Sequence, residues 1–375
     1  MTHRERFRAA VTHGRPDRAV FDLCGSPQTD VDDQTVKDEL AALLGITGEK
    51  RGDYNLDERI LIALDIDTRR VGGMPTPRTA FCREEAGVCY DSFGIGYRRI
   101  NGHGEICHNP LKGRTLAQVE DYPLPDPSRA DASLIEKWAE KGEFLHTQTD
   151  YAVVAEHPVF GVFELGCWMF GFDDFLFRFA AEPEVVHAFF SRVLDYQKQV
   201  IAAYYGALGP YIDCTTSGDD FGTQKAPFMS AGMFDEMIAP YFAERVRYTK
   251  RFTKAFFKHH TCGSVFGLLP SLIACGVEIL NPIQPGAAMM EPERLKENFG
   301  DKLAFWGGVD TQRLLPAGSA GEIKTEVKRI LSVLDKDGGY ILSPAHTIQR
   351  DVPAGNLLAV YEGGREYYGN LTEER

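Results

Sequence analysis

The chain has 375 residues, of which 43% are hydrophobic, and 41 basic against 54 acidic residues give a formal net charge of −13. A chain this rich in apolar residues can bury a core, so intrinsic disorder is excluded as its general state. An acidic chain without a run of lysine or arginine lacks the clustered cations that hold nucleic acid or an anionic membrane surface, so we expect neither as a partner.

The opening segment, residues 1–23, mixes charged and apolar residues. It lacks the apolar stretch of about 7–15 residues that marks a secretory signal. Nowhere do about 18 apolar residues run uninterrupted, as a membrane-spanning helix requires. We therefore expect a soluble, cytoplasmic protein, in which the eight cysteines are reduced and most of them pack as small apolar side chains.

The first third of the chain shows one strand and then an irregular stretch. Residues 21–23 predict the strand, and residues 53–67 have a helical pattern. Because residues 50–135 are otherwise irregular and include the proline-rich YPLPDP at 122–127, we expect an insertion or lid there. Residues 153–163 predict the next strand, and residues 183–205 a long helix with proline at its start.

The second half alternates short apolar strands with helical stretches. The predicted strands are 211–215, 254–259, 277–280, 303–306 and 340–342, and the predicted helices are 233–252, 265–274, 291–298, 322–335 and 354–368. Strands that alternate with helices indicate parallel pairing through right-handed crossovers. At this number of repeats the pattern predicts an α/β fold, a single (β/α)8 barrel domain over residues 1–375.

Polar side chains stand where the predicted strands end, which is where a parallel barrel builds its active site. They are Asp219, Asp220, His260, Cys262, Asn281, Gln284, Asp310 and His346. Each has a plainer structural interpretation on its own, because an aspartate there often caps a helix and an asparagine before proline often forms a turn. Their convergence favours a functional site.

His260 and Cys262 are separated by one residue at a strand end, so both side chains point the same way. An imidazole and a thiol are both good zinc ligands, and a catalytic zinc needs three protein ligands and one open position. His346 is the best third candidate, followed by Asp219, Asp220 and Glu164. Alternatively, Cys262 packs as an apolar group and His260 hydrogen-bonds a substrate.

Five segments of the chain resemble the uroporphyrinogen decarboxylase superfamily. They are RERFRAAVTHGRPDRAVFDL (4–23), DDFGTQKAPFMSAGMFDEMIAPYFAERV (219–246), HTCGSVFGLLPSLIACGVEILNPIQ (260–284), FWGGVD (305–310) and GGYILSPAHTIQRDVPAGN (338–356). The resemblance covers nearly the whole chain, is vaguest over residues 50–135, and implies a distorted (β/α)8 barrel.

Two activities compete within that superfamily. True decarboxylases grip a porphyrinogen's many carboxylates with an arginine-rich N-terminal motif, whereas the matching segment here, FDLCGSPQTDV (21–31), has no arginine. A polyanion is not held without cations, and the net charge of −13 adds to the objection. The resemblance therefore favours the other branch, corrinoid-dependent methyltransferases, whose zinc is held by a His-x-Cys motif and a later cysteine.

His260 and Cys262 match that motif, and His346 stands in the segment where the family has its later cysteine. The resemblance implies methyl transfer between a corrinoid and a small-molecule donor or acceptor. It also implies a carrier protein that holds the corrinoid, and a monomer or homodimer. The metal ligands would be His260, Cys262 and His346. The residues expected to act on or position the substrate are Asp219, Asp220, Glu164, Gln224, Asn281 and Gln284, with Asp310 orienting a ligand histidine.

Three alternatives stay open from the sequence. The chain could be a decarboxylase of a tetrapyrrole or another carboxylated substrate. It could be a hydrolase or lyase that uses the aspartates and histidines without a corrinoid. It could also bind a corrinoid or tetrapyrrole without turnover.

Overall fold

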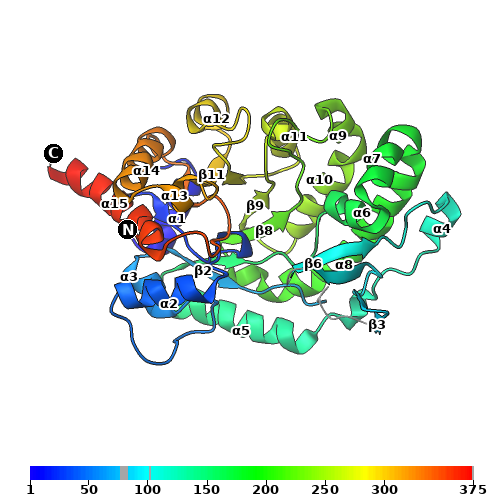
Figure 1. The fold of residues 1–375 in the computed structure, drawn as a ribbon, viewed down its shortest axis with the longest axis horizontal. Helices are drawn as coiled ribbons and strands as arrows, with labels where there is room; N and C mark the ends of the chain where they lie inside the picture. The colour runs from blue at the N-terminus through cyan, green and yellow to red at the C-terminus, as the bar shows by residue number, and fades with distance from the viewer. Residues whose placement is uncertain (77–82, 101–102, 374–375) are drawn as a thin grey trace.

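The fold, a computed structural model in which residues 1–76, 83–100 and 103–373 are described, is built around one parallel barrel sheet (Figure 1). Within the described residues the sheet has eight strands in the order β1-β12-β11-β10-β9-β8-β7-β2, and every pair is parallel. The strands are β1 (Val20–Phe21), β2 (Thr68–Val71), β7 (Ala152–Ala155), β8 (Cys214–Gly218), β9 (Phe256–His260), β10 (Ile279–Ile283), β11 (Ala304–Val309) and β12 (Tyr340–Pro344). The predicted α/β barrel is confirmed.

Helices surround the sheet and connect its strands. The first is α1 (His3–Val11), and the long ones are α2 (Gln34–Leu43), α5 (Ala132–Gln148), α7 (Phe172–Ala181), α8 (Pro183–Leu208), α10 (Ala239–Thr249), α14 (Ala320–Leu334) and α15 (Ala354–Glu373). The shorter ones are α3 (Glu58–Ala63), α4 (Leu116–Glu120), α6 (Val162–Phe170), α9 (Ala231–Met237), α11 (Leu269–Ala274), α12 (Pro292–Phe299) and α13 (Leu314–Ala317). Single 3₁₀ turns lie at Pro27–Thr29, Pro127–Arg129, Gly209–Tyr211 and Phe266–Leu268.

Helix α1 closes the amino end of the barrel. Phe7, Ala10 and Val11 of this helix belong to the same buried cluster as the inward-facing Val20, Ile279 and Trp306 of the strands. The rings of Phe7 and Trp306 meet edge to face with centroids 6.1 Å apart. The amino end of the barrel interior is therefore packed with side chains, and the carboxyl end is where a parallel barrel holds its active site.

Strands β1 and β2 lie at the two edges of the sheet and are joined mainly by hydrogen bonds to side chains rather than by backbone pairing. The backbone N–H of Asp67 donates to the carbonyl of Phe21 at 2.9 Å, and the N–H of Phe21 donates to Asp67 Oδ2 at 2.7 Å. The hydroxyl of Thr68 donates to the buried carboxylate of Asp22. These contacts complete the barrel.

A separate antiparallel sheet, β3 (Arg83–Glu85), β4 (Val88–Tyr90), β5 (Gly96–Ile100) and β6 (His103–His108), lies inside the stretch expected to be an insertion. In Figure 1, β3 and α4 lie on the right, opposite the two chain termini. The insertion is narrower than the predicted 50–135, because α3 and β2 belong to the barrel. The strand β2 was missed because its sequence, TRRV, carries two arginines in a buried strand.

Two further expectations meet the structure. The predicted strand 153–163 is too long, since β7 ends at Ala155 and α6 begins at Val162. All seven described cysteines are free and four of them are buried, while Cys82 lies outside the described residues. In the described part of the chain, none of the helices combines the length and apolarity needed to cross a membrane.

Candidate functional site

Three side chains converge at the carboxyl end of the barrel. His260 ends β9, Cys262 follows two residues later, and His346 follows the last strand, β12. One ligand atom from each lies within 4.8 Å of the others. Cys262 Sγ is 3.4 Å from His260 Nε2, and the two imidazole centroids are 5.5 Å apart. The three predicted metal ligands are thus brought together.

Asn281 orients the first of these imidazoles. Strand register places Asn281 of β10 directly beside His260 of β9. The Nδ1 of His260 lies 2.7 Å from Asn281 Oδ1, while Asn281 Nδ2 donates to the carbonyl of Trp306 at 3.1 Å. Because the amide nitrogen is committed to that carbonyl, its oxygen accepts from Nδ1–H, and Nε2 is left with its lone pair toward Cys262.

The protonation of these groups suits a metal that binds neutral imidazole and thiolate. Burial lowers the pKa of His260 and of His346, against the opposing charge of Asp220, so both rings are neutral at pH 7. Burial, with the carboxylates of Asp220 and Glu164, raises the pKa of the Cys262 thiol. Without a metal the Cys262 thiol keeps its proton at neutral pH. The three side chains therefore fit zinc if the binding of the ion displaces that proton and leaves a thiolate.

The two adjacent aspartates after β8 differ in their surroundings. Asp219 is fully buried, and its two oxygens accept the backbone N–H groups of Phe163 (3.0 Å) and Glu164 (2.7 Å) at the start of α6. Asp220 is 37% exposed, and its Oδ1 accepts the N–H of Cys262 at 2.7 Å and lies 3.9 Å from His260 Nε2. Of these two aspartates, both predicted to be catalytic, only Asp220 has a recorded contact with the candidate ligands.

Asp310, expected to orient a ligand histidine, lies elsewhere in the structure. Its carboxylate accepts the N–H groups of Gln312, Arg313 and Leu314 at 2.9–3.2 Å, at the start of α13. A helix-capping role uses its oxygens, and the orienting role is filled by Asn281 instead. Asn281 in turn was expected to bind substrate, but its side chain is buried and used by His260 and Trp306.

The two predicted glutamines lie beside the Cys262 loop. Gln284 Oε1 accepts the N–H of Gly263 at 2.9 Å, and Gln284 Nε2 donates to Gln224 Oε1 at 3.1 Å. Gln224 also lines a pocket of about 930 Å³ on the rim, together with Asp310. Gln284 therefore contacts the Cys262 loop and Gln224 lines the pocket, whose lining residues do not include His260, Cys262 or His346. Glu164, in the first turn of α6, is close enough to act on the charge of Cys262.

Two cations in the barrel were missed by sequence reasoning. Arg70 of β2 pairs with Asp30 at 3.1 Å and Glu156 at 3.7 Å. Lys258 of β9 is fully buried, donates to Ser26 Oγ at 2.8 Å and lies 4.3 Å from the Trp306 ring centroid. Burial lowers the pKa of Lys258 to about 8. Lys258 could have been predicted to face the barrel interior, because it is two residues from His260 on the same strand. Arg70 could not, because it belongs to the strand that was not predicted.

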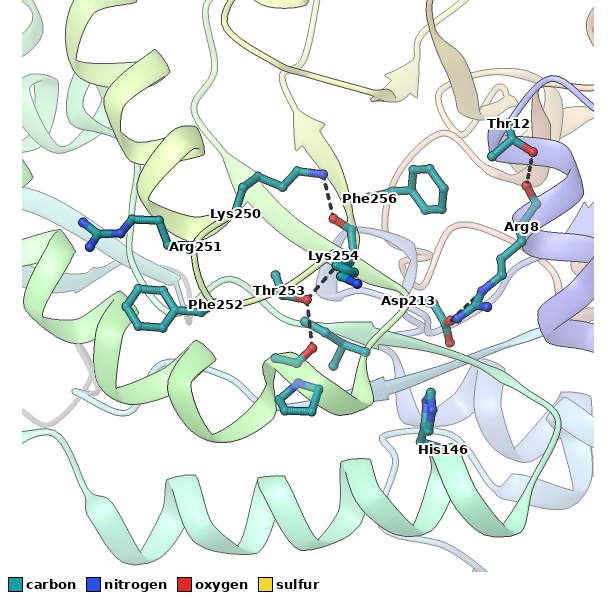
Figure 2. Close-up of a pocket in the computed structure, with 14 residues that line it drawn as sticks. Arg8, Thr12, His146, Asp213, Lys250, Arg251, Phe252, Thr253, Lys254 and Phe256 are labelled. Atoms are coloured by element: carbon teal, nitrogen blue, oxygen red, sulfur yellow. Dashed lines mark hydrogen bonds and ion pairs between the residues drawn. The ribbon is translucent and has the colours of Figure 1, made fainter.

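A second pocket, of about 760 Å³, lies at the opposite, amino end of the barrel. Figure 2 shows Arg8 of α1 meeting Asp213 there, with His146 of α5 nearby. Arg8 donates to Asp213 at 3.0 Å, and Arg4 donates to the same carboxylate at 3.1 Å. The carboxylate that lines this pocket is thus already neutralised.

Comparisons with known proteins support the fold and give a family. The family model described as Uroporphyrinogen decarboxylase (URO-D) matches residues 88–367. A solved methyltransferase from Methanosarcina mazei superposes with a TM-score of 0.65 at 17% sequence identity, over 98% of this chain and 99% of that one. At that identity the likeness shows the fold alone. Native xylanase 10B from Thermotoga maritima, at a TM-score of 0.42 and 11% identity over 69% of this chain and 86% of that one, is too distant to carry an argument. No curated protein matches the sequence significantly.

Proposed function

The chain belongs to the uroporphyrinogen decarboxylase family, and from that premise we propose that it is a methyltransferase of the corrinoid-dependent branch. It moves a methyl group between a corrinoid and a small-molecule donor or acceptor. The observation that carries the proposal is the convergence of His260, Cys262 and His346, whose ligand atoms lie within 4.8 Å of one another. Two imidazoles and a thiolate with one position left open are the donor set of a catalytic zinc site.

In this proposal the chain's residues hold and tune the metal. His260 binds through Nε2, because Asn281 occupies Nδ1, and Cys262 binds as thiolate. Zinc, when bound, lowers the pKa of an entering thiol or other acid and so makes it a nucleophile. Methyl transfer also requires the nucleophile and the methyl carbon to be held in line at about 3–3.5 Å. Gln224 and Gln284 stand at the rim where they can position the small molecule.

We propose that the corrinoid is presented by a carrier protein that docks at the carboxyl end of the barrel. The amino end is sealed by α1, whose Phe7 packs on Trp306, so a bulky group has no access from that side. The pocket of about 930 Å³ beside Gln224 gives room on the open side.

Porphyrinogen decarboxylation is less favoured. The end of β1 supplies no arginine, and the two cations that do lie near it, Arg70 and Lys258, face carboxylates of the protein itself. Arg70 pairs with both Asp30 and Glu156, so little positive charge is left for a substrate with many carboxylates. A decarboxylase of a smaller carboxylated substrate is the second candidate, supported by the family match and these same cations. It predicts release of carbon dioxide without any metal.

Metal analysis of the purified protein tests the proposal most directly. We expect about one zinc per chain, loss of that zinc in Cys262→Ser, and its retention in the matched control Cys107→Ser, because Cys107 is exposed on the separate sheet. With methylcobalamin and a thiol, the wild type should convert the corrinoid spectrum and the Cys262→Ser variant should not. An active protein free of metal would refute the proposal.

A further inference from the structure

Asp220 is the one carboxylate among the described residues recorded within 4.0 Å of a candidate ligand nitrogen. Its Oδ1 is 3.9 Å from His260 Nε2, and the backbone N–H of Cys262 fixes that oxygen at 2.7 Å. The hydrogen bond ties the carboxylate to the same loop that carries the candidate thiolate. Asp220 is therefore positioned by the site's own backbone.

The separations around His260 suit ligands of one ion. Zinc bonds of about 2.0 Å to nitrogen and about 2.3 Å to sulfur give a nitrogen-to-sulfur edge of roughly 3.5 Å in a tetrahedron. The distance from His260 Nε2 to Cys262 Sγ is 3.4 Å. Zinc bonds of about 2.0 Å to both nitrogen and oxygen give a nitrogen-to-oxygen edge of roughly 3.3 Å. Asp220 Oδ1, at 3.9 Å from His260 Nε2, is longer than that edge by about half an ångström, which a small joint shift of the part-exposed carboxylate and the Cys262 N–H that holds it would close.

The charge of the site is a second, independent reason to expect a carboxylate beside the candidate ligands. Two neutral imidazoles and one thiolate leave a divalent ion with a net charge of about +1, where a site with two thiolates would be neutral. His346 stands where the resemblance implies the second thiolate. Within the described residues His260 is the only basic group recorded in ion-pair range of Asp220, so no lysine or arginine there neutralises this carboxylate.

We propose that Asp220 is an exchangeable fourth ligand of the metal and supplies the negative charge that His346 does not. This inference rests on the proposed function, because it presupposes the metal. A carboxylate oxygen is a weaker partner for zinc than a thiolate, so it can leave when substrate enters. The group that takes its place is then one that brings a single negative charge, such as a thiolate, rather than a neutral amine or ether.

The test measures zinc affinity by competition with a chromophoric chelator, and the visible spectrum of the cobalt-substituted protein, for the wild type and two variants. Asp220→Asn keeps an oxygen that accepts the Cys262 N–H but removes the charge. Asp32→Asn is the matched control, because exposed Asp32 acts on His346 by charge alone. We expect Asp220→Asn to weaken zinc binding about 10–100-fold and to change the cobalt bands. Asp32→Asn should change the affinity less than about threefold and leave the bands as they are.

Two results would overturn the inference while leaving the proposed function standing. Wild-type affinity and an unchanged cobalt spectrum in Asp220→Asn would mean that this carboxylate is no ligand. An equal loss in Asp220→Asn and Asp32→Asn, with unchanged bands, would mean that it acts only through general electrostatics. If the wild type itself binds no zinc, the proposed function fails first. Urea unfolding of the metal-free proteins checks that Asp220→Asn is folded to the same extent as the wild type.

Discussion

The two ends of the barrel differ in how their ionisable groups are paired. At the amino end, buried Asp67 receives His3 at 2.7 Å, Arg6 at 2.6 Å and Arg18 at 2.7 Å, and Asp213 receives both Arg4 and Arg8. At the carboxyl end, two imidazoles, a thiol and a carboxylate gather with no lysine or arginine recorded as their ion-pair partner within the described residues. The first arrangement stabilises the fold, and the second keeps ligand atoms available.

The largest effect should come from breaking the amino-end network. We expect Asp67→Asn to lower the free energy of unfolding by about 3–5 kcal/mol, since Asp67 is fully buried and its loss removes a charged partner from buried Arg6. Urea unfolding measures this. The control Asp17→Asn, whose side chain is 44% exposed, should cost less than about 1 kcal/mol. Equal costs for both would contradict the contrast between buried and surface pairs.

Removing the orienting amide at the carboxyl end should act on the metal rather than on the fold. We expect Asn281→Ala to weaken zinc binding about 10–100-fold, because His260 loses the acceptor that holds Nδ1–H. Asn281→Asp keeps an acceptor and should recover much of the affinity. The chelator competition assay measures both. An unchanged affinity in Asn281→Ala would show that ring orientation does not depend on this contact.

As pH falls, protonation of groups at the carboxyl end of the barrel should lower the stability of the protein before protonation of Asp67 does. Burial, with the charge of His260, lowers the pKa of His157 to about 3. Below the unfolded value of about 6.5 the unfolded chain binds a proton that the folded chain does not. Stability is therefore lost as pH falls from 6.5, by about 2 kcal/mol at pH 5.

Unfolding of the metal-free protein between pH 7 and pH 5 measures this loss, and His157→Gln should reduce the slope while the exposed His108→Gln should not. Part of the slope should remain in His157→Gln, because burial also lowers the pKa of His260 and His346. Burial raises the pKa of Asp67, but His3, Arg18 and Arg6 outweigh it and keep it below its usual value. Its contribution is present above the unfolded value of about 3.9 and is lost only as pH falls below it. Loss of stability only below pH 4 would contradict the assignment to His157.

The smallest effect should come from Asp310, and it distinguishes a role in capping backbone N–H groups from a role at the metal site. Asp310→Ala should cost about 0.5–2 kcal/mol of stability, because three backbone N–H groups lose their acceptor, and should leave zinc affinity unchanged. Asp310→Asn, which can still cap, should stay within a few tenths of a kcal/mol of the wild type. A loss of metal in either variant would restore the orienting role first expected of Asp310.

Much of this architecture follows from sequence patterns, and the exceptions have physical causes. Strands β9–β12 contain short apolar runs followed by polar clusters, so they were predictable. The expected strand 211–215 lies three residues early, because β8 (Cys214–Gly218) has the mostly polar sequence CTTSG. Strand β2 was not predictable, because Arg69 is buried there by its ion pair with Glu58 and its stacking on the Tyr151 ring at 3.6 Å. Those partners are set by tertiary packing.

The same limit explains the site. The spacing of His260 and Cys262 at one strand end predicts that they point the same way, and the structure brings His346 to them. Which residue orients His260 depends instead on the register between β9 and β10, which pairs it with Asn281. The register between two strands cannot be predicted from the sequence of either strand alone. That is why the orienting role was assigned to Asp310 rather than to Asn281.

The pairing of β1 with β12, through Val20 with Ile341 and Phe21 with Leu342, ties the first strand to the last. A ribosome must therefore make some 340 residues before the opening strand acquires this neighbour. Until then the nascent polypeptide exposes an unpaired sheet edge and the apolar side of α1, which are the surfaces that chaperones bind and that aggregate when left uncovered.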